Sequence, residues 1–208
     1  MVKAKRKLLI SVILLLCAGL LVILQINYPI TRQSLERLVA TQSSALQTRN
    51  FLSQYSEHFI IKYLPIDEKY VEIILRGSEQ SYDDVVQWFG TDGPVPAPEL
   101  IVFPTAASLA SSFGWDRNQQ SMGVYWGGSI RILSPAEWMD EPSLEEFCRE
   151  GPMVHELCHL MVDEVSGGNY SRWFTEGLAQ YLEKQINGFA FPQPEMTADD
   201  IMGFAEMG

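Results

Sequence analysis

The sequence predicts an α+β fold: a small mixed β-sheet followed by a helical half, with a transmembrane helix at the amino end. Three observations predict it. Short runs with strand composition occur at 57–64, 99–103 and 122–133. Helical periodicity dominates from 143 to 185. An uncharged apolar run occupies 8–26.

The amino end predicts a membrane anchor. Residues 1–7 carry four basic side chains and no acidic one, directly before the apolar run 8–26. A membrane helix needs about 20 apolar residues, which this run just provides. A cleaved signal peptide is the alternative, but its apolar region is typically about 7–15 residues and ends at a small-x-small site, which is missing here. Three leucines precede Cys17, which argues against lipidation. Because the basic flank stays in the cytoplasm, we expect a single-pass signal anchor with the rest of the chain on the extracytoplasmic side.

The charge balance excludes nucleic acid as a partner. The chain has 26 acidic and 15 basic residues. Four of the bases precede the anchor, which leaves 11 bases against 26 acids after it, a formal charge of −15. Such a surface repels nucleic acid and anionic lipid. Three cysteines do not make a disulfide framework, and the sequence leaves the oligomeric state open.

The chain after the anchor divides into a stalk and one domain. Residues 27–56 are polar with sparse apolar positions, which favours a helical stalk. The domain then spans 57–208, a length of about 150 residues that is enough for one core. Its predicted elements are, in order, a strand at 57–64, a helix from Asp67 to Gly90, a strand at 99–103 and a brief helix ending near Gly114. Another helix starts at 197–200 and the chain stops at Gly208, so the domain is expected to be truncated there.

A β-hairpin is expected at 122–133. Two strand-like runs, 122–126 and 129–133, flank Gly127 and Gly128, and two glycines favour a primed two-residue turn. Ser143 and Glu146 then form a capping box for a short helix that breaks at Gly151. A further helix begins near Pro152 and is apolar on most of its surface.

That helix carries the most informative motif of the chain. Residues 155–159 read H-E-L-C-H and contain two of the three histidines. Residues four apart stack on one helix face, so His155 and His159 can close on one zinc ion. Glu156 can reach a metal-bound water without binding the metal. The pattern predicts a zinc-dependent hydrolase; the alternative is a buried helix whose histidines are satisfied by hydrogen bonds.

The third metal ligand has to come from another element. Asp163 lies eight residues after His155, about 12 Å along a helix, too far for all to meet at one ion. The turn at 166–169 ends the first helix, and Ser171 can cap a second one from about 172 to 185. Glu176, one turn into it, is the predicted ligand, and Glu183 is expected to be solvated.

Residues 152–185 resemble the gluzincin metallopeptidases. The H-E-L-C-H pentapeptide followed by W-F-T-E-G-L-A at 173–179 is similar to the bacterial peptidase MA-like domains and, more distantly, to the aminopeptidase N and thermolysin groups. The resemblance implies a zincin-like fold, one zinc ion held by His155, His159 and Glu176, and Glu156 as the general base. Two features depart from these families. The chain has no G-x-M-E-N motif, and Gln180 stands where thermolysin-like relatives carry an aspartate.

The sequence therefore predicts a membrane-anchored zinc metallopeptidase that hydrolyses a peptide or protein substrate. Tyr125, Tyr170 and Tyr181 are the candidates for stabilising the oxyanion. By resemblance, one hairpin strand holds the substrate in extended form, although an ordinary hairpin covering the core is equally compatible. The rival functions are a catalytically weak or inactive zinc-binding scaffold and an assembly protein unrelated to metal.

Overall fold

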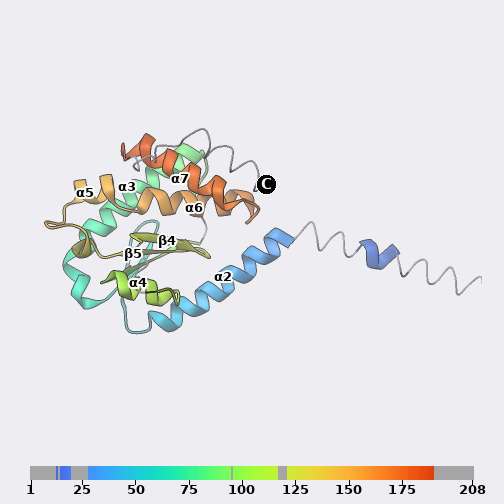
Figure 1. Ribbon diagram of the computed structural model, residues 1–208, viewed down its shortest axis with the longest axis horizontal. Helices are drawn as coiled ribbons and strands as arrows, with labels where there is room; N and C mark the ends of the chain where they lie inside the picture. Colours follow the sequence, from blue (N-terminus) through green and yellow to red (C-terminus); the bar gives the residue numbers. More distant parts are fainter. Residues whose placement is uncertain (1–12, 14, 20–27, 95, 117–120, 190–208) are drawn as a thin grey trace, which may run out of the picture.

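The computed structural model describes residues 13, 15–19, 28–94, 96–116 and 121–189 (Figure 1). Its sheet has five strands in the order β1-β2-β3-β5-β4. The strands are β1 Leu52–Tyr55, β2 Ile60–Tyr63, β3 Glu99–Phe103, β4 Gly123–Trp126 and β5 Ser129–Leu133. Strands β2, β3 and β5 are parallel, and the two edge strands β1 and β4 are antiparallel to their neighbours. The predicted mixed sheet in an α+β fold is confirmed.

Helices cover both faces of the sheet (Figure 1). One face carries α3 Val71–Phe89, α5 Leu144–Glu150, α6 Met153–Ser166 and α7 Arg172–Ile186, and the other carries α2 Tyr28–Gln47 and α4 Ala106–Ser112. Two short 3₁₀ helices, Pro65–Tyr70 and Pro135–Glu137, complete the described elements. Because both faces are covered, β5 is buried along its whole length, as is usual for central strands of such sheets.

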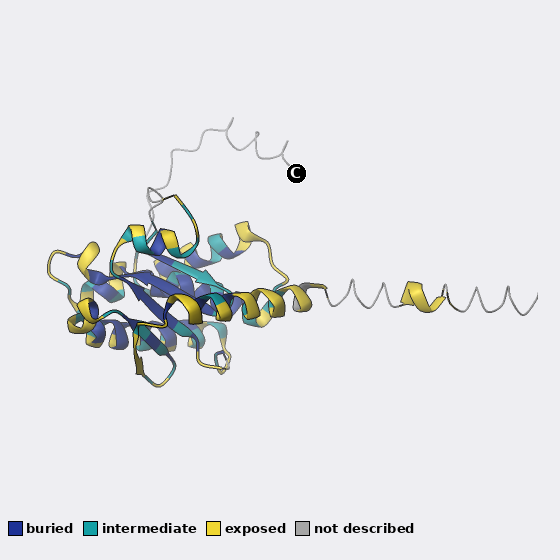
Figure 2. Cartoon of the chain, turned by 90° about the horizontal axis from the view of Figure 1, so that it is seen from below, coloured by how far each residue is buried: buried dark blue, intermediate teal, exposed yellow. Residues whose placement is uncertain are grey.

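The main core lies between the sheet and the layer of α3, α6 and α7. Alternate residues of the strands, such as Ile61 and Ile130, meet the apolar surface of α6 there. A smaller cluster of Ile101, Phe103, Leu109 and Leu133 lies on the α4 side of the sheet. Figure 2 shows this burial concentrated in the strands and in the inner faces of the helices.

The turn residues act as the sequence predicts. Gly127 and Gly128 have φ values of 55° and 87°, which only a primed hairpin turn requires at both positions. The Ser143 hydroxyl accepts a hydrogen bond from the Glu146 N–H and so caps α5, but the return bond to the Glu146 side chain that the predicted capping box requires is not among those of the described residues. All three cysteines are free, and Cys158 is buried in the core.

The region predicted to be a stalk is part of the folded unit. Its helix, α2, lies against the hairpin and the end of α6, as its contacts with Gly127 and Asp163 show. Its last segment is strand β1, which pairs with β2. The sheet therefore begins before residue 57. The helical prediction for this region holds for α2, but the detached arrangement does not.

The predicted anchor at 8–26 lies mostly outside the described residues, and the helix expected from residue 197 lies wholly outside them. Within the part of the chain that the structure describes, no helix combines the length and apolarity needed to span a membrane.

Candidate metal and catalytic site

Helices α6 and α7 form an antiparallel pair that brings the motif residues together. Helix α6 ends at Ser166, and Gly167 after it has a left-handed φ of 60°, followed by Gly168 with a φ of 78°. Such residues end a helix and reverse the chain at low steric cost. Ser171 precedes α7, as predicted, although its hydroxyl makes no capping hydrogen bond. Burial of Ala179 and Leu182 then fixes α7 against the core.

Three potential ligand atoms converge between the two helices. The Glu176 Oε2 atom lies 3.4 Å from the Nε2 atom of His155 and 3.7 Å from that of His159. One ligand atom from each of the three residues falls within 4.8 Å of the other two. A tetrahedral zinc site with bonds of about 2.0–2.1 Å has ligand–ligand edges of roughly 3.3–3.4 Å. The observed spacing and the two-nitrogen, one-carboxylate donor set therefore fit zinc.

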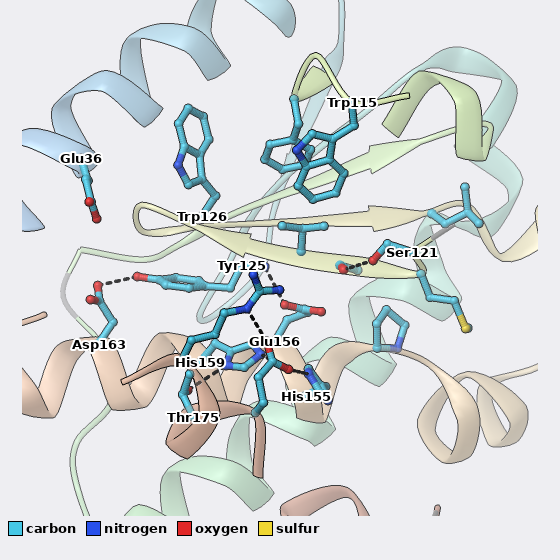
Figure 3. Close-up of a pocket in the computed structure, with 18 of the residues that line it drawn as sticks. Glu36, Trp115, Ser121, Tyr125, Trp126, His155, Glu156, His159, Asp163 and Thr175 are labelled. Carbon is cyan, nitrogen blue, oxygen red and sulfur yellow. Dashed lines mark hydrogen bonds and ion pairs between the residues drawn. The ribbon is translucent and has the colours of Figure 1, made fainter. Parts of the chain in front are cut away.

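The other ring nitrogen of each histidine is also engaged (Figure 3). The Nδ1 atom of His155 lies 2.9 Å from Glu183 Oε2, and that of His159 lies 2.8 Å from the Thr175 hydroxyl. An ionised carboxylate on Nδ1 places the proton there and leaves the Nε2 lone pair for a metal. Both rings are therefore oriented with Nε2 toward Glu176.

Glu183 corrects the sequence-based expectation. It was expected to be solvated, but it is only 4% exposed and bonds His155. Glu183 lies seven residues after Glu176, two helical turns on, so both carboxylates share one face of α7. That spacing is a signal that could have identified it. Gln180, considered for this orienting role, is exposed, and its side chain makes no hydrogen bond among those of the described residues.

Glu156 lies beneath the edge strand β4. Its Oε2 atom accepts a hydrogen bond of 2.6 Å from the backbone N–H of Tyr125, and the residue is 5% exposed. Burial raises the pKa of Glu156 to about 7, although His155 and the Tyr125 N–H act in the opposite direction. Gly123 makes room for this carboxylate, because an added Cβ would lie 2.9 Å from Glu156 Oε1.

The two histidines have opposite pKa shifts. Burial lowers the pKa of His159, and the neighbouring His155 lowers it further. Burial also opposes the charged form of His155, but the hydrogen bond to Glu183 and the surrounding carboxylates raise its pKa overall. The Glu183 contact is therefore the main feature that distinguishes the two rings electrostatically.

A cleft of about 1400 Å³ opens along β4, α6, α7 and the first half of α2. His155, Glu156, His159 and Glu176 are among its lining residues. Arg172 also lines it, with Nε 3.4 Å from Glu176 Oε1, and was not identified from the sequence. The cleft is large enough to take several residues of an extended peptide.

The three tyrosines considered for oxyanion binding differ in position. The Tyr125 hydroxyl donates to Asp163 Oδ2 at 2.6 Å and accepts from the Gly128 N–H, so it is already engaged (Figure 3). Tyr170 lines the cleft and also interacts with Asp163. Tyr181 is 52% exposed, faces Trp88 and does not line the cleft.

No protein-family model matches the chain, and no curated protein matches it either.

Proposed function

We propose that this chain is a zinc metallopeptidase that hydrolyses peptide bonds, with a zincin-like fold and a gluzincin-type ligand set. One observation carries the proposal: His155, His159 and Glu176 direct one ligand atom each toward a common point between α6 and α7. The spacing of the motif residues in the sequence supports the same ligand set. Two imidazoles and a carboxylate favour zinc over calcium or magnesium, which prefer oxygen ligands.

The ligands are held by the fold. Glu183 and Thr175 hold the two imidazoles from behind, and α7 supplies both of these residues as well as Glu176. Zinc bound there would supply Lewis-acid chemistry, lowering the pKa of a water molecule and polarising a carbonyl.

Glu156 is the proposed general base. Its carboxylate follows His155 on α6 and reaches the cleft beside the ligands. Its role is to accept a proton from the attacking water and return it to the leaving amine. The N–H of Tyr125 binds one of its oxygens and so holds the carboxylate in one orientation.

The free edge of strand β4 is an argument for a peptide as the substrate. Its partner β5 occupies only one side of β4, so the other side faces the cleft. An extended peptide can add to such an edge through main-chain hydrogen bonds. Because the Tyr125 N–H on this edge is bonded to Glu156, a substrate would have to share or replace that contact.

The test is zinc content followed by peptide turnover. We expect one zinc ion per chain in the wild type and in Glu156→Gln. The wild type should cleave members of a peptide library, and Glu156→Gln should lower kcat by about 10²–10⁴-fold, the range typical of a lost general base. Glu145→Gln, an exposed residue of α5, is the matched control. A zinc-loaded wild type as inactive as Glu156→Gln would favour the zinc-binding scaffold, and absence of stoichiometric zinc would reject both.

We further propose that the chain is a single-pass membrane protein with its cleft on the extracytoplasmic side. The support is the apolar run 8–26 behind four basic residues. In membrane vesicles of known sidedness, a protease should reach the domain only from the extracytoplasmic face. Digestion from the cytoplasmic face would contradict this topology.

A further inference from the structure

Helix α2 docks on the domain through its polar side. The Gln33 amide donates to the Asp163 carbonyl at 2.8 Å, and Arg37 binds the Asp163 carboxylate at 2.7 Å. One turn further on, Ala40 lies against Gly127, where an added Cβ would come within 2.5 Å of the alanine Cβ. Ser44, fully buried, accepts from Arg131. Spacings of four, three and four residues place these side chains on one face of α2.

The opposite face of α2 is apolar and open. Its large apolar side chains are between 52% and 73% exposed: Tyr28, Leu35, Leu38, Val39 and Leu46. Figure 2 shows the length of α2 coloured largely as exposed. A helix on a protein surface normally has the reverse arrangement, with its apolar stripe inward. Exposed apolar stripes of this kind mark an interaction surface.

The spacing of the open face is that of a coiled-coil seam. Leu35, Val39, Gln42 and Leu46 follow one another at intervals of four, three and four residues. Toward the amino end the same repeat continues through Arg32, seven residues before Val39, to Tyr28, seven residues before Leu35. This is the repeat that brings two helices together along a continuous stripe. From Tyr28 to Leu46 the stripe extends about 27 Å, at 1.5 Å per residue. We name Tyr28, Leu35, Val39, Gln42 and Leu46 the outer seam of α2.

The charge of α2 favours a second copy of the same chain as the partner. The chain has a net charge of −11, so most of its surface repels a second copy. Helix α2 has two arginines and one glutamate, a formal charge of +1, and Glu36 is paired with Arg32 at 2.7 Å within the helix. The five residues of the outer seam are uncharged, and Arg32, which falls in the same register between Tyr28 and Leu35, is neutralised by Glu36. Two copies can therefore approach along this stripe without the net repulsion found elsewhere.

Gln42 selects the direction of the pairing. In a parallel pair each seam residue faces its own counterpart, so the two Gln42 amides can hydrogen-bond to each other. In an antiparallel pair with Leu35 opposite Leu46, Gln42 would face Val39 and its amide would be buried without a partner, which is costly. We propose that the outer seam of α2 pairs in parallel with the outer seam of a second copy of this chain, forming a two-fold dimer.

The pairing leaves the cleft open. Gln33 and Glu36 line the cleft from outside the seam, and Arg32 lies at the border between the cleft and the seam. The side of α2 that holds Asp163 is also separate from the seam. The dimer is therefore compatible with the proposed activity but does not depend on it.

Cysteine cross-linking of the full chain tests the dimer. Cys17 and Cys148 are first replaced by serine, which leaves only the buried Cys158. In this background, Val39→Cys should form a disulfide-linked dimer under mild oxidation, at a rate at least about tenfold above Thr41→Cys. Such a ratio corresponds to about 1.4 kcal/mol. Thr41 is an exposed residue of α2 outside the seam and is the matched control.

Mass measurement on the full chain provides the second readout. The wild type should have twice the 23.5 kDa of one chain, and Val39→Asp should have the mass of one chain with unchanged helix content, because the docked face is untouched. A monomeric wild type overturns the proposal. An antiparallel pairing would also overturn it: in a mixture of Leu35→Cys and Leu46→Cys chains, residue 35 would then link to residue 46, while Val39→Cys would not link to itself. A membrane as the partner would overturn it too, and a fluorophore at residue 39 would then be shielded only when lipid vesicles are added.

Discussion

Helices α7 and α2 both lie against α6, but different forces hold them there. Helix α7 contributes Ala179 and Leu182 to the core, and neither side chain is exposed. Helix α2 contributes mainly polar contacts, of which the Arg37–Asp163 pair at 2.7 Å is an example. Apolar burial is not directional and holds α7 firmly, whereas the docking of α2 depends on a few hydrogen bonds.

The difference matters because both helices bound the same cleft. Helix α7 carries Glu176, Thr175 and Glu183, so any movement of α7 changes the metal site itself. Helix α2 lines the cleft but contacts α6 at Asp163 and Glu164, away from the ligands, and Asp163 also accepts from the Tyr125 hydroxyl. We therefore expect perturbations of α7 to be measured as changes in zinc affinity, and perturbations of α2 as changes in stability.

The largest expected effect is on the α7 side, at the ligand carboxylate. Glu176→Ala should lower zinc affinity by more than the roughly 10–100-fold that removal of an orienting partner costs, because one of three ligands is lost. Isothermal titration with zinc measures this. A chelator should also lower the Tm of the wild type and leave that of Glu176→Ala unchanged, since only a bound ion stabilises the folded state. An unchanged affinity in this variant would remove Glu176 from the ligand set.

A smaller effect on zinc affinity is expected from Glu183, which orients the His155 ring. Glu183→Gln keeps the size of the side chain but weakens its hold on His155 Nδ1, so zinc affinity should fall about 10–100-fold. Lys184→Gln, the next residue on α7, is the control and should bind zinc as the wild type does. If Glu183→Gln also binds like the wild type, the carboxylate fills space without orienting the ring.

The contrast between α7 and α2 also explains what could be predicted from sequence. The ligands follow from local periodicity: His155 and His159 lie four residues apart, and one short turn returns the chain with Glu176. Strand β3 and the hairpin likewise follow from composition and glycine turns. Such signals depend on residues that are close in the chain, where helix and strand geometry fix the distances.

Long-range polar contacts have no such signal. The contacts of α2 join Arg37 to Asp163, 126 residues apart. Without knowledge of that partner, a polar helix with sparse leucines is predicted to be a stalk. Arg131 is another example: alternation along β5 does not indicate a buried guanidinium. Helix α2 covers it, and the rings of Phe113 and Trp126 lie 4.5 and 5.0 Å from its Cζ atom. The place of each polar group depends on a partner that periodicity cannot identify.

On the α2 side, Arg37→Met should weaken docking without reaching the metal. The variant removes the ion pairs of Arg37 with Asp163 and Glu164. A hydrogen bond to a charged group contributes about 1.5–3 kcal/mol, so urea unfolding should show a loss in that range at most. Hydrogen exchange should increase first in α2, and zinc affinity should stay at the wild-type value. A fall in zinc affinity would mean that α2 and α7 are coupled more strongly than their contacts indicate.

The smallest expected effect is at Arg32, one turn before its partner Glu36 on the same helix. Its partner Glu36 lies at the same 2.7 Å as in the Arg37 pair, but the two side chains are 63% and 52% exposed, against 26% and 8% for Arg37 and Asp163. Water and salt screen the exposed pair, and ordering two long side chains offsets much of its attraction. Arg32→Gln should therefore leave the Tm unchanged within error, while Arg37→Met lowers it. Equal losses in the two variants would show that distance, rather than burial, sets the contribution of each arginine to the docking of α2.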